Sequence, residues 1–152
     1  MERENAIEVL NTLITINNDR IEGYETASKE TEELDLKSLF AQFILTSKRC
    51  KQELVNEVNK LGGEEAEGTL TSGKFFRMWM DVKAALTGKD RKAILDSCEF
   101  GEDEAQATYE NVLKNDFEHL TAVQQTLIYA QKILLKADHN HVKALRIALA
   151  DA

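Results

Sequence analysis

The segment GGEEAEGTLTSGKFFRMWMDVKAALTGKD, residues 62–90, separates two halves of the chain that both have the pattern of paired helices. A loop between neighbouring antiparallel helices needs only a few residues, so this segment is far longer than such a loop. It contains an amphipathic stretch that predicts a short helix over about residues 74–86. Such a helix covers about 18 Å, and about ten extended flanking residues add about 33 Å. The segment can therefore climb a bundle about 40 Å long, and the helices before and after it are expected to run parallel.

Four long helices are expected around this crossover, because apolar residues recur there every three or four positions. The absence of proline from all 152 residues agrees with few, long helices. Their expected bounds are about residues 2–30, 35–61, 90–115 and 117–149, with the crossover at residues 62–89. Short links within each half predict two antiparallel hairpins. We expect one all-α domain over residues 1–152, a ferritin-like four-helix bundle, with a plain up-down bundle as the alternative.

The expected inward stripe of the last helix consists of Leu120, Val123, Leu127, Ala130, Ile133/Leu134, Ala137, His141, Leu145 and Ala148. These residues follow the helical period, so they are expected to pack against the other three helices.

The overall charge and the cysteines restrict the class of protein. The chain has 27 acidic and 19 basic residues, and a formal charge of -8 disfavours binding to nucleic acid or anionic lipid. Cys50 and Cys98 lie far apart and form no CxxC pattern, which is typical of buried thiols in a reducing compartment. We see neither the apolar stretch of a signal peptide nor a run of about 20 apolar residues for a membrane span. A cytoplasmic protein is expected.

Five polar side chains fall on or beside the expected inward stripes: Asn17, Tyr24, Arg49, Glu99 and Glu102. Buried charges need an opposite charge or a metal ion. A guanidinium offers a planar fork of donors that matches carboxylates. The pattern therefore predicts an ion pair inside the bundle, with Arg49 facing Glu99 and Glu102.

A carboxylate metal site is the alternative interpretation. Di-iron bundles place a Glu on each of two helices and a Glu-x-x-His motif on each of the other two. Glu99 and Glu102 have the required spacing, but no His follows, and Glu22 or Glu25 would have to complete an iron or manganese site. Only one of the expected half-motifs is recognisable, which favours the ion pair and a protein without a cofactor.

Four pieces of the chain, in order, together resemble a bacterial family: INNDRIEGYETA at residues 16–27, the glycine-rich pattern of the crossover (Gly62, Gly63, Gly73, Lys74, Arg77, Trp79), CEFGEDEA at 98–105 and HNHVKALR at 139–146. This family is the one catalogued as domain of unknown function 2383, placed beside the ferritin-like superfamily. The resemblance implies a ferritin-like bundle in a bacterium and supplies no function. The Glu-x-x-His pairs of the wider superfamily are missing here, so iron oxidation and iron storage are not expected.

These observations favour a non-enzymatic binding protein, with a stress-associated role suggested by the superfamily analogy alone. The rival is a carboxylate-bridged metal-binding protein or a metal-dependent oxidoreductase with a reduced ligand set. Phe75, Phe76 and Trp79 of the crossover form a candidate homodimer contact, because aromatic residues are enriched at interfaces. No nucleic-acid or membrane partner is expected.

Overall fold

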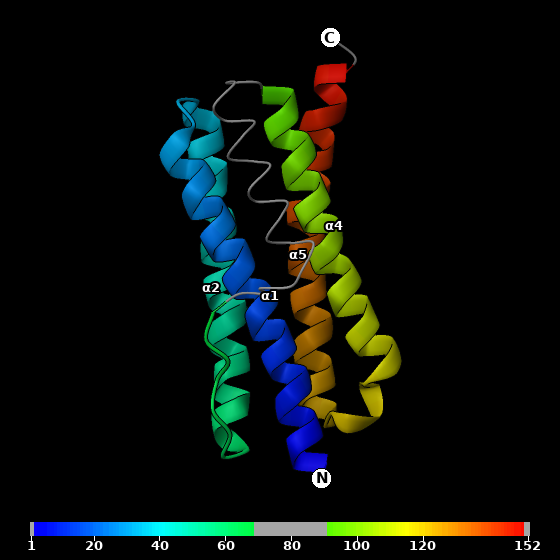
Figure 1. Cartoon of the computed structure of the whole chain (residues 1–152). Coiled ribbons are helices and arrows are strands. Elements are labelled where there is room, and N and C mark those ends of the chain that lie inside the picture. Colours follow the sequence, from blue (N-terminus) through cyan, green and yellow to red (C-terminus); the bar gives the residue numbers. More distant parts are fainter. Residues whose placement is uncertain (1, 69–90, 151–152) are drawn as a thin grey trace.

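The computed structural model describes residues 2–68 and 91–150, and these ranges form a bundle of four long helices (Figure 1). The helices are α1 (Glu2–Glu30), α2 (Leu34–Lys60), α4 (Arg91–Asn115) and α5 (Ala122–Ala150), and a short 3₁₀ helix, η1 (Phe117–His119), precedes α5. The all-α, four-helix class expected from the sequence is confirmed. The short helix expected over residues 74–86, and the homodimer contact expected there, lie outside the described residues.

Two helical hairpins make up the bundle. α1 packs along α2, α4 packs along α5, and the hairpins meet through α1 with α4 and through α2 with α5. The shared core is built from aliphatic and aromatic side chains of all four helices, among them Leu13, Phe40, Leu95 and Ile128. Within the described residues, no helix is long and apolar enough to cross a membrane.

Polar contacts at the two ends of the bundle show that α2 and α4 run parallel. Arg91, the first residue of α4, contacts Glu33 and Asp35 at the start of α2, both at 2.8 Å. At the opposite end, the Nη1 atom of Arg3 donates to the carbonyl oxygen of Leu61 at 2.7 Å, so α2 ends beside the start of α1. α2 and α4 therefore begin at the same end (Figure 1), which is the single-crossover arrangement predicted from the length of residues 62–90.

The first residues of the crossover climb the surface of α1. Gly62 ends α2 in the left-handed region, with φ at 75°, which glycine adopts without strain. The side chain of Asn11 donates to the carbonyl of Glu64 at 3.0 Å and accepts from the amide of Ala66 at 2.8 Å. Two turns further along α1, Asn18 donates to the carbonyl of Gly68 at 2.9 Å. These bonds direct the segment along α1 toward the end where α4 begins.

The last helix begins later than expected from the sequence. Residues 117–119 form a 3₁₀ turn and Leu120 is extended, so α5 starts only at Ala122. The start is set by a reciprocal cap, in which the Gln124 side chain accepts from the Thr121 amide at 3.0 Å and the Thr121 hydroxyl accepts from the Gln124 amide at 3.1 Å. This T-x-x-Q pattern is a capping box.

The stripe predicted to face inward on α5 is wrong at several positions, although Leu120 is buried and Leu145 packs against the core. Val123 is 68% exposed and Ile133 is 69% exposed, and Ala130 and His141 are exposed as well. The buried positions are instead Gln124, Ile128, Gln131, Leu135, His139 and Val142. α5 has two apolar stripes, and the one that carries Gln124 and Gln131 faces the core: Gln124 is satisfied by the cap at Thr121, and the amide of Gln131 finds partners on α4 and α2.

Candidate functional site

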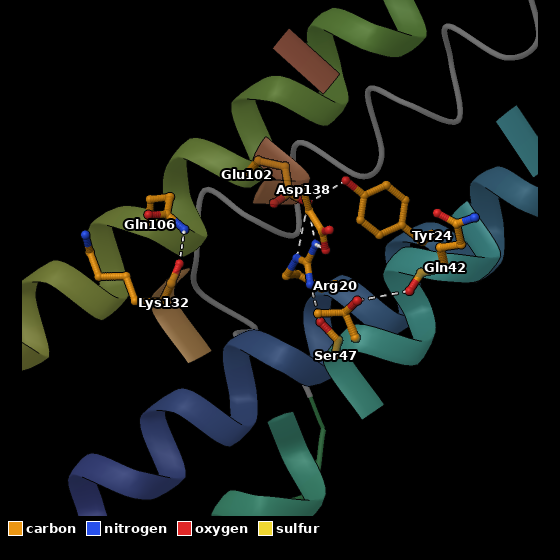
Figure 2. A network of polar contacts seen from close by, with 9 residues as sticks. Arg20, Tyr24, Gln42, Ser47, Glu102, Gln106, Lys132 and Asp138 are labelled. Atoms are coloured by element: carbon orange, nitrogen blue, oxygen red, sulfur yellow. Dashed lines mark hydrogen bonds and ion pairs between the residues drawn. The ribbon is translucent and has the colours of Figure 1, made fainter. Parts of the chain in front are cut away.

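A fully buried arginine, Arg20 of α1, lies at the centre of the bundle (Figure 2). Its Nε and Nη2 atoms donate to one oxygen of Glu102, Oε1, at 3.1 and 2.7 Å. Its Nη1 atom donates to the hydroxyl of Ser47, and its Nη2 atom also contacts Asp138 Oδ2 at 3.1 Å. These partners come from α4, α2 and α5, so a single guanidinium connects all four helices.

Glu102 is the most constrained carboxylate of this network. Its side chain is 1% exposed, and Oε1 also accepts the hydroxyl of Tyr24 at 2.6 Å. Its other oxygen, Oε2, is buried and has no hydrogen-bond partner among the described residues. Two carboxylates, Glu102 and Asp138, thus share one cation in a poorly solvated interior. Removing one partner of such a buried pair costs about 3–5 kcal/mol of stability.

The surroundings shift the pKa values of Arg20, Tyr24 and Asp138 away from their ordinary values. Burial is the largest single influence on Arg20 and lowers its pKa, but Glu102, Tyr24 and Asp138 together outweigh burial, so the pKa of Arg20 is raised above its ordinary value. Burial, with Glu102 nearby, also raises the pKa of Tyr24 well above its usual range, so Tyr24 remains a hydroxyl donor. Burial raises the pKa of Asp138 to about 6, although Arg20 acts in the opposite direction.

A second polar chain crosses the bundle at a different level. The Asn17 amide donates to the Tyr109 hydroxyl at 2.9 Å, which in turn donates to Gln131 Oε1 at 2.8 Å. The Gln131 amide then donates to the carbonyl of Cys50 at 3.1 Å and to Glu53 at 3.2 Å. Each of the four helices therefore contributes to this chain as well, and the two levels together fix the rotation of every helix about its axis.

Three of the residues predicted from the sequence to lie inside the bundle are buried: Asn17, Tyr24 and Glu102. Tyr24 and Glu102 share the network of Arg20, and Asn17 belongs to the second chain.

The predicted position of Arg49 is wrong, because its side chain is exposed. It lies next to the buried Cys50, and one residue rotates the side-chain direction by about 100° around a helix, which turns Arg49 outward. Glu99 is separated from Glu102 as well: it is partly buried at the edge of α4 and pairs with Arg146 of α5. The cation that neutralises Glu102 is Arg20.

Four residues of the two polar networks were not among the predicted site residues: Arg20, Ser47, Gln131 and Asp138. For Arg20 a signal was present, because it lies three residues after Asn17 and four before Tyr24, on the same helical face. For Ser47, Gln131 and Asp138 the signal is weaker, since polar residues at such positions are more often solvated.

A metal centre does not fit the residues at the middle of this bundle. Ferritin-like carboxylate proteins place their metal ions there between side chains of facing helices. Here the guanidinium of Arg20 lies against both carboxylates, and a divalent ion beside it would be repelled. The alternative ligands Glu22 and Glu25 are exposed on the outer side of α1. Within residues 2–68 and 91–150, no group of three or more His, Cys, Asp or Glu side chains could hold a metal ion.

A family model matches the greater part of the chain. The model described as "Domain of unknown function (DUF2383)" matches residues 5–115, which include α2, α4 and nearly all of α1. α5, which supplies Asp138 and Gln131, lies outside the match. The chain has no match among the curated proteins.

Proposed function

The chain belongs to the family of this domain of unknown function (DUF2383), and we propose that it is a non-enzymatic binding protein that acts through its outer surface. The observation that carries the proposal is the burial of Arg20 between Glu102, Ser47 and Asp138 at the bundle centre. A catalytic carboxylate centre needs an open position for a substrate or metal ligand. Here the central carboxylates are already paired with a cation.

The location and the physiological role belong to the same proposal. Two free, buried cysteines support a reducing compartment such as a bacterial cytoplasm. A stress-associated role rests on the analogy with ferritin-like folds, which is a fold-level argument.

Elemental analysis of protein purified without chelators tests the proposal. We expect iron, manganese and zinc far below one ion per chain, both in the parent and in Glu102→Ala. Stoichiometric metal that is lost in Glu102→Ala would overturn it and favour the carboxylate-bridged metal-binding protein.

A variant designed to gain metal binding tests whether Arg20 is what keeps a metal ion out of the bundle centre. Arg20→Glu replaces the cation by a third carboxylate beside Glu102 and Asp138, so Mn²⁺ should bind and raise the melting temperature of this variant. Arg49→Glu is the matched control, because the same change is made at an exposed position of α2. If Mn²⁺ stabilises neither variant, or both equally, Arg20 is not what excludes the metal.

A further inference from the structure

The outer side of α5 carries an apolar stripe that faces solvent. Val123, Ile133 and Ile147 are 68%, 69% and 42% exposed, and Tyr129 beside them is 50% exposed. Between the large residues lie smaller exposed ones: Thr126, Ala130, Ala137, Asn140 and Ala144. Their spacing alternates between three and four residues, which is the a/d pattern of a coiled-coil seam and extends over about 36 Å.

We propose that this stripe pairs two copies of the chain, with α5 antiparallel to α5 of the partner about a twofold axis. This contact involves only the outer face of α5, so it does not depend on the polar network at the bundle centre. It also differs from the contact expected at the crossover, because it involves none of the residues 62–90.

The order of side-chain sizes along the stripe favours a second copy in the antiparallel direction. In an antiparallel pair each a position faces a d position, so Ile133 faces the partner's Ala137 when the axis passes near Leu135. In the same register Thr126 faces the partner's Ala144, and Ala130 faces the partner's Asn140. The two central layers thus each pair a large residue with a small one, which permits close interdigitation, and Val123 faces the partner's Ile147 at each end of the seam. A parallel pair would instead oppose Ile133 to Ile133 and Ala137 to Ala137, with a seam of uneven width.

The surface around Ala137 has room for the incoming isoleucine. A shallow groove of about 380 Å³ is lined by Tyr129, Ile133 and Ala137, together with Lys132, Lys136 and Asn140. In the antiparallel register the partner's Ile133 enters this groove over Ala137. Tyr129 then faces the partner's Lys143, an arrangement in which a cation and an aromatic ring attract each other.

The charges of the bundle are compatible with this contact. α1 holds six Glu and one Asp, and it packs on α2 and α4, away from the outer side of α5. Pairing through α5 therefore keeps the most acidic helix of each copy distant from the other copy. Lys136 acts against the contact. It lies near Lys136 of the other copy across the twofold axis, and the repulsion of these like charges weakens the dimer.

The contact area predicts a reversible dimer. A seam about 36 Å long and about 10 Å wide removes roughly 700 Å² in total from solvent, below the roughly 1,200 Å² of most stable complexes. We therefore expect a dissociation constant in the micromolar range, on the order of 10–100 µM.

Sedimentation equilibrium of the full chain tests the proposal over about 1–500 µM. The parent should change from monomer to dimer with rising concentration. Ile133→Ala leaves two small residues facing each other, and Ala137→Ile brings two isoleucines together, so each should weaken the dimer by about tenfold or more. The double variant Ile133→Ala/Ala137→Ile exchanges the large and the small residue of the layer. Its dimer dissociation constant should return to within about threefold of the parent's.

Leu34→Ala is the matched control, because Leu34 is 80% exposed on α2 and should leave association unchanged. Both stripe positions are exposed in the single chain, so the variants should keep the parent's helical circular dichroism. A parent that stays monomeric throughout the range would overturn the proposal. A double variant that associates as weakly as the single variants would also overturn it. The same holds for a parent that stays monomeric and sediments with phosphatidylglycerol vesicles.

Discussion

Replacing Arg20 by methionine should destabilise the bundle strongly. Methionine keeps an unbranched apolar stem but removes every donor to Glu102, Ser47 and Asp138. Glu102 is 1% exposed, so its carboxylate would remain buried without a counter-charge. Breaking a buried ion pair by removing one partner costs about 3–5 kcal/mol.

This loss is large relative to the whole stability of such a domain, about 5–15 kcal/mol. Urea denaturation followed by far-ultraviolet circular dichroism should show a transition midpoint lower by about 1–3 M, with an unchanged slope. The melting temperature should fall by about 6–20 °C for a domain of this length.

Two further variants separate the ion pair from a simple loss of packing. Arg49→Met changes the same residue type at an exposed position of α2 and should alter the free energy of unfolding by less than about 0.5 kcal/mol. Arg20→Met/Glu102→Met removes both buried charges and should recover most of the lost stability, because Asp138 is 15% exposed and can be hydrated. Equal midpoints for Arg20→Met and the parent, or a double variant less stable than Arg20→Met, would refute the reasoning.

The remaining predictions concern Asp138, the second polar chain and the thiols. Burial raises the pKa of Asp138 from its ordinary value of 3.8 to about 6, so between these values the folded protein binds more protons than the unfolded chain. The free energy of unfolding should therefore decrease from about pH 4 to pH 6 relative to Asp138→Asn, by about 1–3 kcal/mol in urea titrations, and a carboxyl midpoint near 4 by NMR would contradict this. Tyr109→Phe leaves the buried Oε1 atom of Gln131 without its donor and should cost about 1–3 kcal/mol, whereas a midpoint unchanged in urea would show that this bond adds no stability. Burial raises the pKa of the Cys50 thiol to about 12 and that of Cys98 well above its usual range. Both thiols should therefore react with a disulfide reagent only as fast as the protein unfolds. Rapid labelling of the native protein would be inconsistent with the fold.

The sequence by itself determined the helices and their connection, because these depend on neighbouring residues and on length. The three-and-four spacing of apolar residues is local, and the reach of residues 62–90 is a property of the chain alone. The inward positions of Asn17, Tyr24 and Glu102 followed from the same spacing.

Only the tertiary structure decided which side chains meet. Arg20 and Arg49 each lie near the middle of a helix, and the register of α1 against α4 selects Arg20 as the partner of Glu102. α5 offers two apolar stripes of the same period, and the choice between them depends on partners far away in sequence. Gln131 can be buried because Tyr109 and the Cys50 carbonyl satisfy its amide, which leaves Ile133 in solvent. Local periodicity contains no information about such partners, since the free energy of a buried polar group depends on groups that the fold brings to it.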